Sequence, residues 1–277
     1  MVFIDVLGVL LIPALLAGVV AGMFGLGGGV VMVPAIYFVL THMGVGAELA
    51  MSMSVATSLL AIVVTGLSSA LAHARLENID FVLLKRWLLP LLCGAVVGSA
   101  LVARYRTPAL ITFFGVFLWL VALMNVLVQR RAKPSGNVHS HNPFLNRLTL
   151  PLVFGIGCVA ALAGVGGGTL SVPLLKSLGR DTHKAIGTSA AMGLALAFAA
   201  SLNVLVFSAE DEGIPRGALG LFYLPALIVI LPCTVLLAPV GAYLGKRMPA
   251  AVLDKLFVAL LLLVGTRMVL SSFQVVG

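Results

Sequence analysis

A glycine-rich apolar segment occurs twice in this chain, about half a chain length apart. The stretch AGMFGLGGGVVMVP from Ala21 to Pro34 returns as AALAGVGGGTLSVP from Ala160 to Pro173, and seven of the fourteen positions are identical. Glycine-broken hydrophobic segments at matching places in two halves are the best sequence indicator of a binding site inside a transporter. The duplication therefore predicts a chain built from two related halves.

The composition places these halves in a membrane. Hydrophobic residues make up 61% of the chain and charged residues 9%, against about 45–50% and about 25% in soluble domains. The net charge of +8 comes from cations between the apolar runs, where they set membrane orientation. We therefore expect a lipid bilayer, and not nucleic acid, as the partner of this surface.

Five apolar runs are expected in each half. They cover about 6–24, 30–40, 50–72, 87–103 and 110–128, and then about 150–163, 169–175, 185–207, 221–244 and 253–273. The predicted domains are a first repeat over 1–128, a polar cytoplasmic linker over 129–149 and a second repeat over 150–277. No cation precedes the first run, so Val6–Phe24 is expected to remain as an uncleaved helix. The matching motifs GAVVG, from Gly94 to Gly98, and GAYLG, from Gly241 to Gly245, predict close helix packing.

The run after each glycine cluster is too short to cross a membrane, since residues 30–40 give only about 16 Å of helix. Each cluster is therefore expected to be the apex of a helical hairpin, which either crosses fully or only re-enters the membrane. Three full helices follow, so each half crosses an odd number of times and the halves are inverted. The expected fold is an all-α polytopic membrane protein with two inverted repeats, each a glycine-apex hairpin plus three transmembrane helices.

The cations support the inverted arrangement. Thirteen lie on one face and three on the other, whereas a parallel arrangement of the halves removes this positive-inside bias. We therefore expect a multi-pass protein of the cell inner membrane with both termini on the non-cytoplasmic side, although an organelle membrane is also compatible. The cytoplasmic set is Arg75, Lys85, Arg86, Arg130, Arg131, Lys133, Arg147, Lys176, Arg180, Lys184, Lys246, Arg247 and Lys255, and the opposite set is Arg104, Arg106 and Arg216.

The two glycine apices are the predicted substrate site. Broken helical backbone is tolerated inside a membrane where it lines a cavity or meets a ligand, and helix N-termini aimed at the apex suit an anion. Neighbouring Thr-Ser pairs add hydroxyl donors, and one cation within the last apolar run either pairs with an anion or extends to the interface. Alternatively, the glycines only permit packing and the hydroxyls bond to their own helices. The candidate substrate-binding residues are Gly25, Gly27, Gly28, Gly29, Thr57, Ser58, Gly164, Gly166, Gly167, Gly168, Thr169, Ser171, Thr188, Ser189 and Arg267.

Other chemistry is sparse in the sequence. His73 and His183, at cytoplasmic helix ends, either carry protons near neutral pH or are exposed structural residues. The three cysteines form no CxxC pair, so neither disulfides nor a metal site is expected. Motifs for hydrolases, metalloproteases and ATP binding are missing, so we expect no catalytic residues, no cofactor and an ion gradient or the substrate's own gradient as driving force.

The paired motifs GLGGGVVMVP and GVGGGTLSVP, followed by ATS and GTS, resemble those of the TauE/SafE family of sulfite exporters, also called the sulfonate uptake permease family. The resemblance covers essentially the whole chain. It implies a transporter of sulfite, sulfonates or other small organosulfur and carboxylate anions, often outward and coupled to protons. By position, it assigns binding to Gly25–Gly29, Gly164–Gly168 and the Thr-Ser pairs.

Two departures between the copies make the second apex the more polar one. Ala56 and Met32 in the first copy correspond to Gly187 and Ser171 in the second, which also has Thr169. The second half is therefore expected to make more side-chain contacts with an anion. The alternatives are a channel for similar ions, a non-transporting subunit of a membrane complex and an intramembrane enzyme, and a homo-oligomer is compatible with each.

Overall fold

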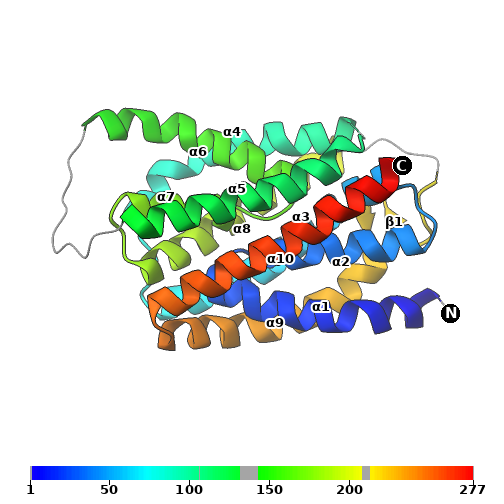
Figure 1. The fold of residues 1–277 in the computed structure, drawn as a ribbon, viewed down its shortest axis with the longest axis horizontal. Coiled ribbons are helices and arrows are strands. Elements are labelled where there is room, and N and C mark those ends of the chain that lie inside the picture. Colours follow the sequence, from blue (N-terminus) through cyan, green and yellow to red (C-terminus); the bar gives the residue numbers. More distant parts are fainter. Residues whose placement is uncertain (1, 106, 132–142, 208–212, 277) are drawn as a thin grey trace.

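Residues 2–105, 107–131, 143–207 and 213–276, which the computed structural model describes, form ten helices and one short β hairpin. The helices lie side by side along one axis of the molecule (Figure 1). In the first half they are α1 (Val2–Phe24), α2 (Gly29–His42), α3 (Ala47–Arg75), α4 (Phe81–Arg104) and α5 (Ala109–Arg131). In the second half they are α6 (Pro143–Ala163), α7 (Gly168–Ser177), α8 (Thr182–Phe207), the strands β1 (Ala218–Leu219) and β2 (Phe222–Tyr223), α9 (Leu224–Arg247) and α10 (Ala250–Val276).

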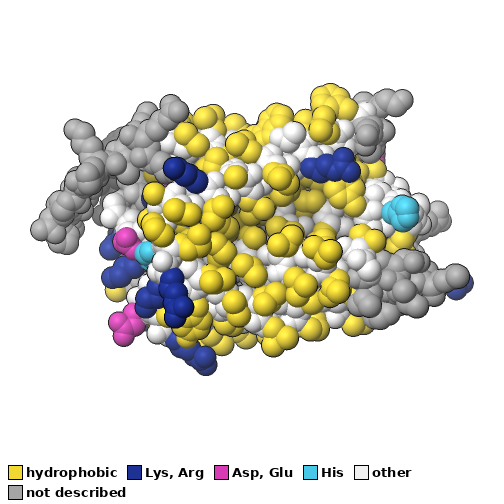
Figure 2. All heavy atoms as spheres, turned by 60° about the horizontal axis from the view of Figure 1, so that its bottom comes forward, with side chains coloured by type: hydrophobic (Ala, Val, Ile, Leu, Met, Phe, Trp, Pro, Cys, Tyr) yellow, Lys and Arg dark blue, Asp and Glu magenta, His cyan; other side chains and the backbone are white. Residues whose placement is uncertain are grey.

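The surface and the helix lengths identify a multi-pass membrane protein. Among the described residues, α3, α4, α5, α8, α9 and α10 are long and apolar enough to cross a bilayer, and α1, α2 and α6 contain shorter apolar stretches. Figure 2 shows a band of hydrophobic side chains over the middle of one face, with most visible Lys and Arg side chains toward one end. The prediction of an all-α polytopic membrane protein is confirmed.

The expected apolar runs coincide with the ten helices, except at the start of α9. Residues 221–223 were predicted within a helical run, but they form the turn and second strand of the β hairpin. The helix begins only at Leu224 because Gly217 and Gly220 adopt positive φ before it, and Pro225 suits a first helical turn. At the linker, α6 already begins at Pro143, and residues 132–142 lie outside the described residues.

Helix packing follows the same pattern in both halves. α1 packs along α9, and its counterpart α6 packs along α4, while α3 packs on α8 and α5 on α10. Glycines allow the close approach: a Cβ atom at Gly94 would lie 2.0 Å from the carbonyl oxygen of Phe154, and one at Gly241 would lie 2.1 Å from that of Val19. The GAVVG and GAYLG motifs therefore lie at helix crossings, as expected.

The two hairpins enter from opposite ends of the molecule. Both described ends of the chain lie at the same end in Figure 1, and α1 and α2 form a hairpin that opens there. α6 and α7 form the corresponding hairpin, which opens toward the other end. The glycine apices, where each hairpin turns, meet in the interior.

Candidate functional site

The two glycine apices contact each other through their backbones. A Cβ atom at Gly29 would lie 2.4 Å from the carbonyl oxygen of Gly164, and one at Gly168 would lie 2.3 Å from that of Gly25. Leu26, in the first apex, is fully buried. The first residue of each short helix thus lies against the glycine at which the opposite hairpin turns, so the structure brings both predicted clusters together.

The backbone conformation requires glycine at most of these positions. The φ angles are positive at Gly25, Gly27, Gly28, Gly164 and Gly166, between 64° and 85°. Such values are costly for residues with a side chain.

Gly167 differs from its counterpart Gly28. It has an ordinary helical φ of −64°, and a Cβ atom there would meet nothing closer than 3.6 Å. The second apex therefore has room beside Gly167, near Gly193 of α8, the Ser171 hydroxyl and Leu196.

Two of the predicted hydroxyls hold the apex backbone. Ser58 Oγ on α3 donates a 2.8 Å hydrogen bond to the carbonyl oxygen of Gly164. Ser189 Oγ on α8 lies 3.5 Å from the corresponding carbonyl oxygen of Gly25 and donates at 2.8 Å to Ile186 of its own helix. Each long helix therefore supports the apex of the hairpin that belongs to the other half.

The two threonines of the Thr-Ser pairs hold helix starts in the opposite half. Thr57 Oγ1 accepts a 2.9 Å hydrogen bond from the backbone N–H of Tyr223, the residue before α9. Thr188 Oγ1 accepts one of the same length from the backbone N–H of Asp80, the residue before α4. Sequence reasoning identified these hydroxyls but not their partners, which lie 166 and 108 residues away.

Two hydroxyls at the second apex are buried without a hydrogen-bond partner among the described residues. They belong to Thr169 and Ser171, in the first turns of α7, and both side chains are completely buried. Within the described segments no side chain caps α2 or α7, since Gly28 and Gly167 occupy the positions before them. Free hydroxyls beside an uncapped helix N-terminus offer hydrogen-bond donors and a positive dipole end to an anion.

Arg267 does not reach the apices. Its side chain is exposed on α10, and its guanidinium lies 5.0 Å from the centre of the Phe38 ring on α2. Phe38 is nine residues beyond Gly29, or about 14 Å along a helix. The cation–aromatic contact places Arg267 on the outer surface of the first hairpin.

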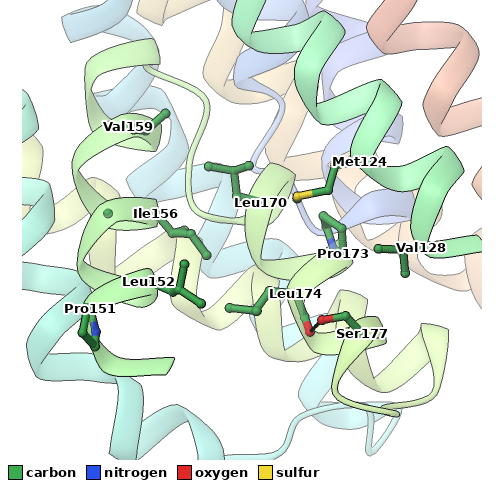
Figure 3. A pocket seen from close by; sticks show the side chains of 11 residues that line it. Met124, Val128, Pro151, Leu152, Ile156, Val159, Leu170, Pro173, Leu174 and Ser177 are labelled. Atoms are coloured by element: carbon green, nitrogen blue, oxygen red, sulfur yellow. Dashed lines mark hydrogen bonds between the residues drawn. The ribbon is translucent and has the colours of Figure 1, made fainter. Parts of the chain in front are cut away.

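An apolar cavity occupies the matching place beside the second hairpin. It has a volume of about 500 Å³ and lies between α5, α6 and α7 (Figure 3). Aligning LWLVALMNVL of α5 with LLLVGTRMVL of α10 makes Met124 the counterpart of Arg267, and Ser177 is the counterpart of Phe38. Both line the cavity, and the Ser177 hydroxyl bonds to Leu174 of its own helix. This apolar lining suits hydrocarbon and not an anion.

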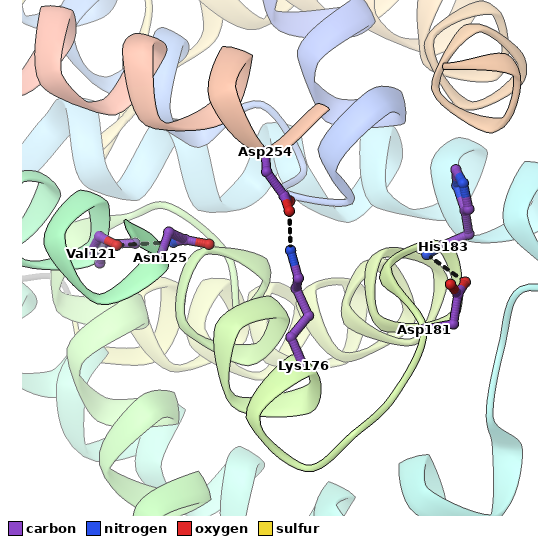
Figure 4. Close-up of polar contacts among 6 residues, drawn as sticks. All are labelled: Val121, Asn125, Lys176, Asp181, His183 and Asp254. Carbon is purple, nitrogen blue, oxygen red and sulfur yellow. Dashed lines mark hydrogen bonds and ion pairs between the residues drawn. The ribbon is translucent and has the colours of Figure 1, made fainter. Parts of the chain in front are cut away.

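Ion pairs fasten the second hairpin at the cation-rich end. Lys176, on the last turn of α7, pairs with Asp254 at the start of α10, and both side chains are largely buried (Figure 4). Arg180, after α7, lies 3.1 Å from Asp80, whose other oxygen caps α4 at Leu83. Figure 4 also shows Asn125 donating to Val121 of its own helix.

His73 is buried and not an exposed helix-end residue. Only 3% of its surface is exposed. Its Nε2 lies 2.8 Å from the carbonyl oxygen of Gly22 near the end of α1, and its Nδ1 has no partner among the described residues. The position near a charged helix end suggested exposure from sequence, but α1 covers it.

Comparison with protein families agrees with this architecture. The model of the family "Sulfite exporter TauE/SafE" matches residues 10–268. The chain belongs to the TauE/SafE family. It is therefore a membrane transporter, and the matched residues include both glycine apices.

The relatives of this chain carry the name of probable membrane transporter proteins. A "Probable membrane transporter protein" of Haemophilus influenzae is 30% identical over 261 residues, which cover 94% of this chain and 97% of that protein. The "Probable membrane transporter protein YunE" of Bacillus subtilis is 24% identical over 275 residues, covering 94% and 96%. A third relative, MJ0441 of Methanocaldococcus jannaschii, is 25% identical over 68% of both chains. No solved structure matches the chain significantly.

Proposed function

We propose that this TauE/SafE protein is a secondary transporter that exports sulfite or a small organosulfur or sulfonate anion, driven by an ion gradient, with protons as the coupling ion. The anion is held where the two glycine apices meet, with most contacts from the second apex. The substrate passes unchanged, without covalent chemistry and without a cofactor.

The observation that carries this proposal is the pair of hydroxyls at the second apex that have no hydrogen-bond partner in the part of the chain that the structure describes. Buried hydroxyls without partners are uncommon and costly, so each needs an explanation. Thr169 and Ser171 lie beside the uncapped start of α7, where the helix dipole favours negative charge. A small oxyanion satisfies both requirements at once, because its oxygens accept from hydroxyl and backbone N–H donors.

In this proposal the other candidate hydroxyls have a supporting role, which their hydrogen bonds favour. Ser58 and Ser189 hold the apex carbonyl groups, and Thr57 and Thr188 hold helix starts. These hydrogen bonds hold the two apices in a fixed position relative to each other while the anion is bound. The apices are buried, and their hairpins open toward opposite ends of the molecule. When one hairpin moves away from the other, the anion site becomes accessible from one side of the membrane, and movement of the other hairpin makes it accessible from the opposite side.

Labelled sulfite flux in proteoliposomes, with and without a pH gradient, tests the proposal. Gly167→Ala is expected to retain flux, whereas Gly167→Leu fills the space beside Ser171 and is expected to abolish it. Gly8→Leu is the matched control, because Gly8 is exposed on α1 with nothing within 4 Å of its Cβ position. Equal flux through the wild type and Gly167→Leu would refute the apex as the binding site.

The alternative substrate is a small carboxylate, which the same donors can bind. Competition of labelled sulfite flux by methanesulfonate and by acetate separates the two classes. Inhibition by the sulfonate alone supports the organosulfur assignment, and inhibition by acetate alone favours carboxylates. A flux that does not saturate with concentration would favour a channel.

We also propose that the halves are inverted in the inner membrane with both termini outside the cytoplasm. The support is that most Lys and Arg side chains visible in Figure 2 lie toward the end opposite the described chain ends of Figure 1, and that Lys246 and Arg247 form the last turn of α9. Single cysteines at Arg104 and Lys246, in a protein with Cys93, Cys158 and Cys233 replaced by alanine, test this. A membrane-impermeant maleimide is expected to label position 104 in intact cells and position 246 only after permeabilisation.

A further inference from the structure

The apolar cavity between α5, α6 and α7 opens to the lipid-facing surface of the protein, because Leu152 in its lining is 47% exposed. Pro151 and Ser177 line the end of the cavity near the start of α6, and Val159 and Leu170 line its inner end (Figure 3). The cavity extends about 12 Å along α6, and one monolayer contains about 15 Å of hydrocarbon. Its depth therefore suits a lipid acyl chain.

The lining of the cavity suits hydrocarbon better than water or empty space. A buried water needs about two to four polar partners. Ser177 has the only hydroxyl among the described lining residues, and that hydroxyl already donates to Leu174 of its own helix. An empty cavity of about 500 Å³ is unfavourable, because the side chains around it lack packing partners. An apolar molecule from the bilayer satisfies the lining.

The cavity is too small for a helix from a second copy of the chain. A helix with its side chains is about 10 Å wide, so a 12 Å length of it occupies about 900 Å³. The cavity has a volume of about 500 Å³. An acyl chain is a single row of methylene groups and is much thinner than a helix, so it is the occupant that fits.

Positive charge flanks the cavity at the cation-rich end of the protein. Arg147 of α6 precedes the lining residue Pro151 by four residues, and Arg131 of α5 follows the lining residue Val128 by three. These spacings place two residues on the same face of a helix. The sequence of α5, α6 and the segment between them contains no Asp or Glu. Neither helix therefore provides a carboxylate for its own arginines.

The cations at the end of the second hairpin have protein partners. Lys176 pairs with Asp254 of α10, and Arg180 pairs with Asp80 before α4. The acidic residues at this end of α7 are thus already engaged. A negative group placed beside the ends of α5 and α6 has to come from outside the chain.

We propose that the cavity binds one acyl chain of an anionic phospholipid, whose headgroup lies beside the ends of α5 and α6 that carry Arg131 and Arg147. A basic site between transmembrane helices is the usual form of an anionic-lipid site. Leu170, between Thr169 and Ser171 of the second apex, lines the cavity, so the acyl chain packs against the first turns of α7. The proposal does not depend on which substrate the protein transports.

Gly155→Leu tests the acyl-chain site. Gly155 lines the cavity, a Cβ atom there would meet nothing within 4 Å, and its counterpart in α1 is Leu16. The leucine therefore fills the cavity without a clash and favours the helix. Native mass spectrometry with added phosphatidylglycerol is expected to show one tightly bound lipid on the wild type. Binding to the variant should be at least about tenfold weaker, since displacing two methylene groups is already worth that much.

Gly8→Leu is the matched control, because Gly8 is exposed on α1 with open space at its Cβ position. It should bind the lipid as the wild type does. Equal lipid binding by the wild type and by Gly155→Leu would overturn the proposal. A change in the dimer fraction of Gly155→Leu without a change in lipid binding would also overturn it and would favour an interface between copies.

Arg131→Gln/Arg147→Gln tests the headgroup. The preference for phosphatidylglycerol over phosphatidylcholine is expected to fall about fivefold for each arginine removed. Arg104→Gln is the control, because Arg104 is exposed on the last turn of α4, away from the cavity. An unchanged preference in the double variant would overturn the assignment of an anionic lipid.

Photo-crosslinking of the wild type gives a measurement that needs no variant. The probe is phosphatidylglycerol with a diazirine in one acyl chain, incorporated into proteoliposomes. Adducts are expected to concentrate on the peptides that contain Val159 and Leu170, at the inner end of the cavity. Adducts spread evenly over all lipid-facing helices would overturn the proposal. Neither this measurement nor lipid binding involves sulfite, so a failure of sulfite flux would reject the proposed function alone.

Discussion

The hydroxyl of Ser58 donates a 2.8 Å hydrogen bond to the carbonyl oxygen of Gly164, 106 residues further along the chain. Ser58 belongs to the first half, and Gly164 is the residue at which the second hairpin turns. Helical backbone bonding stops at such a turn, so its carbonyl group needs a partner from elsewhere. A side chain of the first half therefore supplies the hydrogen bond that a backbone carbonyl group of the second half lacks.

Ser58→Ala is expected to destabilise the protein by about 1–3 kcal/mol, because it leaves the buried carbonyl oxygen of Gly164 without its donor. Thermal unfolding in detergent measures the loss. Ser177→Ala is the control, since that hydroxyl is exposed and bonds within its own helix. Equal unfolding temperatures for the two variants would contradict the assigned role of Ser58.

Thr57→Val and Thr188→Val are each expected to cost about 1–3 kcal/mol, because the buried N–H groups of Tyr223 and Asp80 lose their acceptor. Valine keeps the shape of threonine, so packing changes little. Thr→Ser at either position retains an oxygen and should restore most of the stability. Failure of serine to restore it would show that the methyl group, and not the hydrogen bond, matters there.

Alanine scanning of neighbouring apex glycines should give opposite results at adjacent positions. Gly168→Ala places a methyl group 2.3 Å from the carbonyl oxygen of Gly25, so the apices must separate, and little folded protein is expected. Gly167→Ala meets nothing closer than 3.6 Å and keeps a helical φ. Size-exclusion profiles of the two variants report the difference, and two similar profiles would contradict the backbone contact between apices.

Lys176→Met is expected to destabilise the protein more than the double variant Lys176→Met/Asp254→Leu. The single change leaves a largely buried carboxylate without its partner, which typically costs about 3 kcal/mol, whereas removing both charges is often neutral. A double-mutant cycle on unfolding temperatures measures the coupling. Additive effects of Lys176→Met and Asp254→Leu would show that the pair contributes no coupling.

The sequence predicted the helices because their signals are local. Long apolar runs indicate membrane spans, and glycine clusters indicate the turns between them. Five of the apex glycines adopt positive φ angles, which explain their presence. The start of α9 was misplaced because the strand residues Phe222 and Tyr223 are as apolar as the helix that follows them.

The partners of the polar side chains could not be predicted, because they come from distant segments. Thr57 and Thr188 were predicted as substrate-binding residues, and nothing in the sequence indicated that their hydroxyls accept hydrogen bonds from the backbone of Tyr223 and Asp80. Arg267 lies on a helix that is apolar on every side, so no periodicity indicates which face it occupies. His73 required knowledge of where α1 ends, since that helix buries the ring.

The reciprocal support of the apices has a consequence for biogenesis. Gly164 packs against Val55 and Ser58 of α3, and Gly25 packs against Ile186 and Ser189 of α8. While the ribosome is still making the middle of the chain, the first hairpin is already in the bilayer with the turn at Gly25 unsupported. It stays incomplete until residues beyond Ser189 have been translated and inserted. Newly made first halves should therefore depend on an insertase or membrane chaperone that shields the turn, and a chain cut within the linker should be degraded unless both pieces are made together.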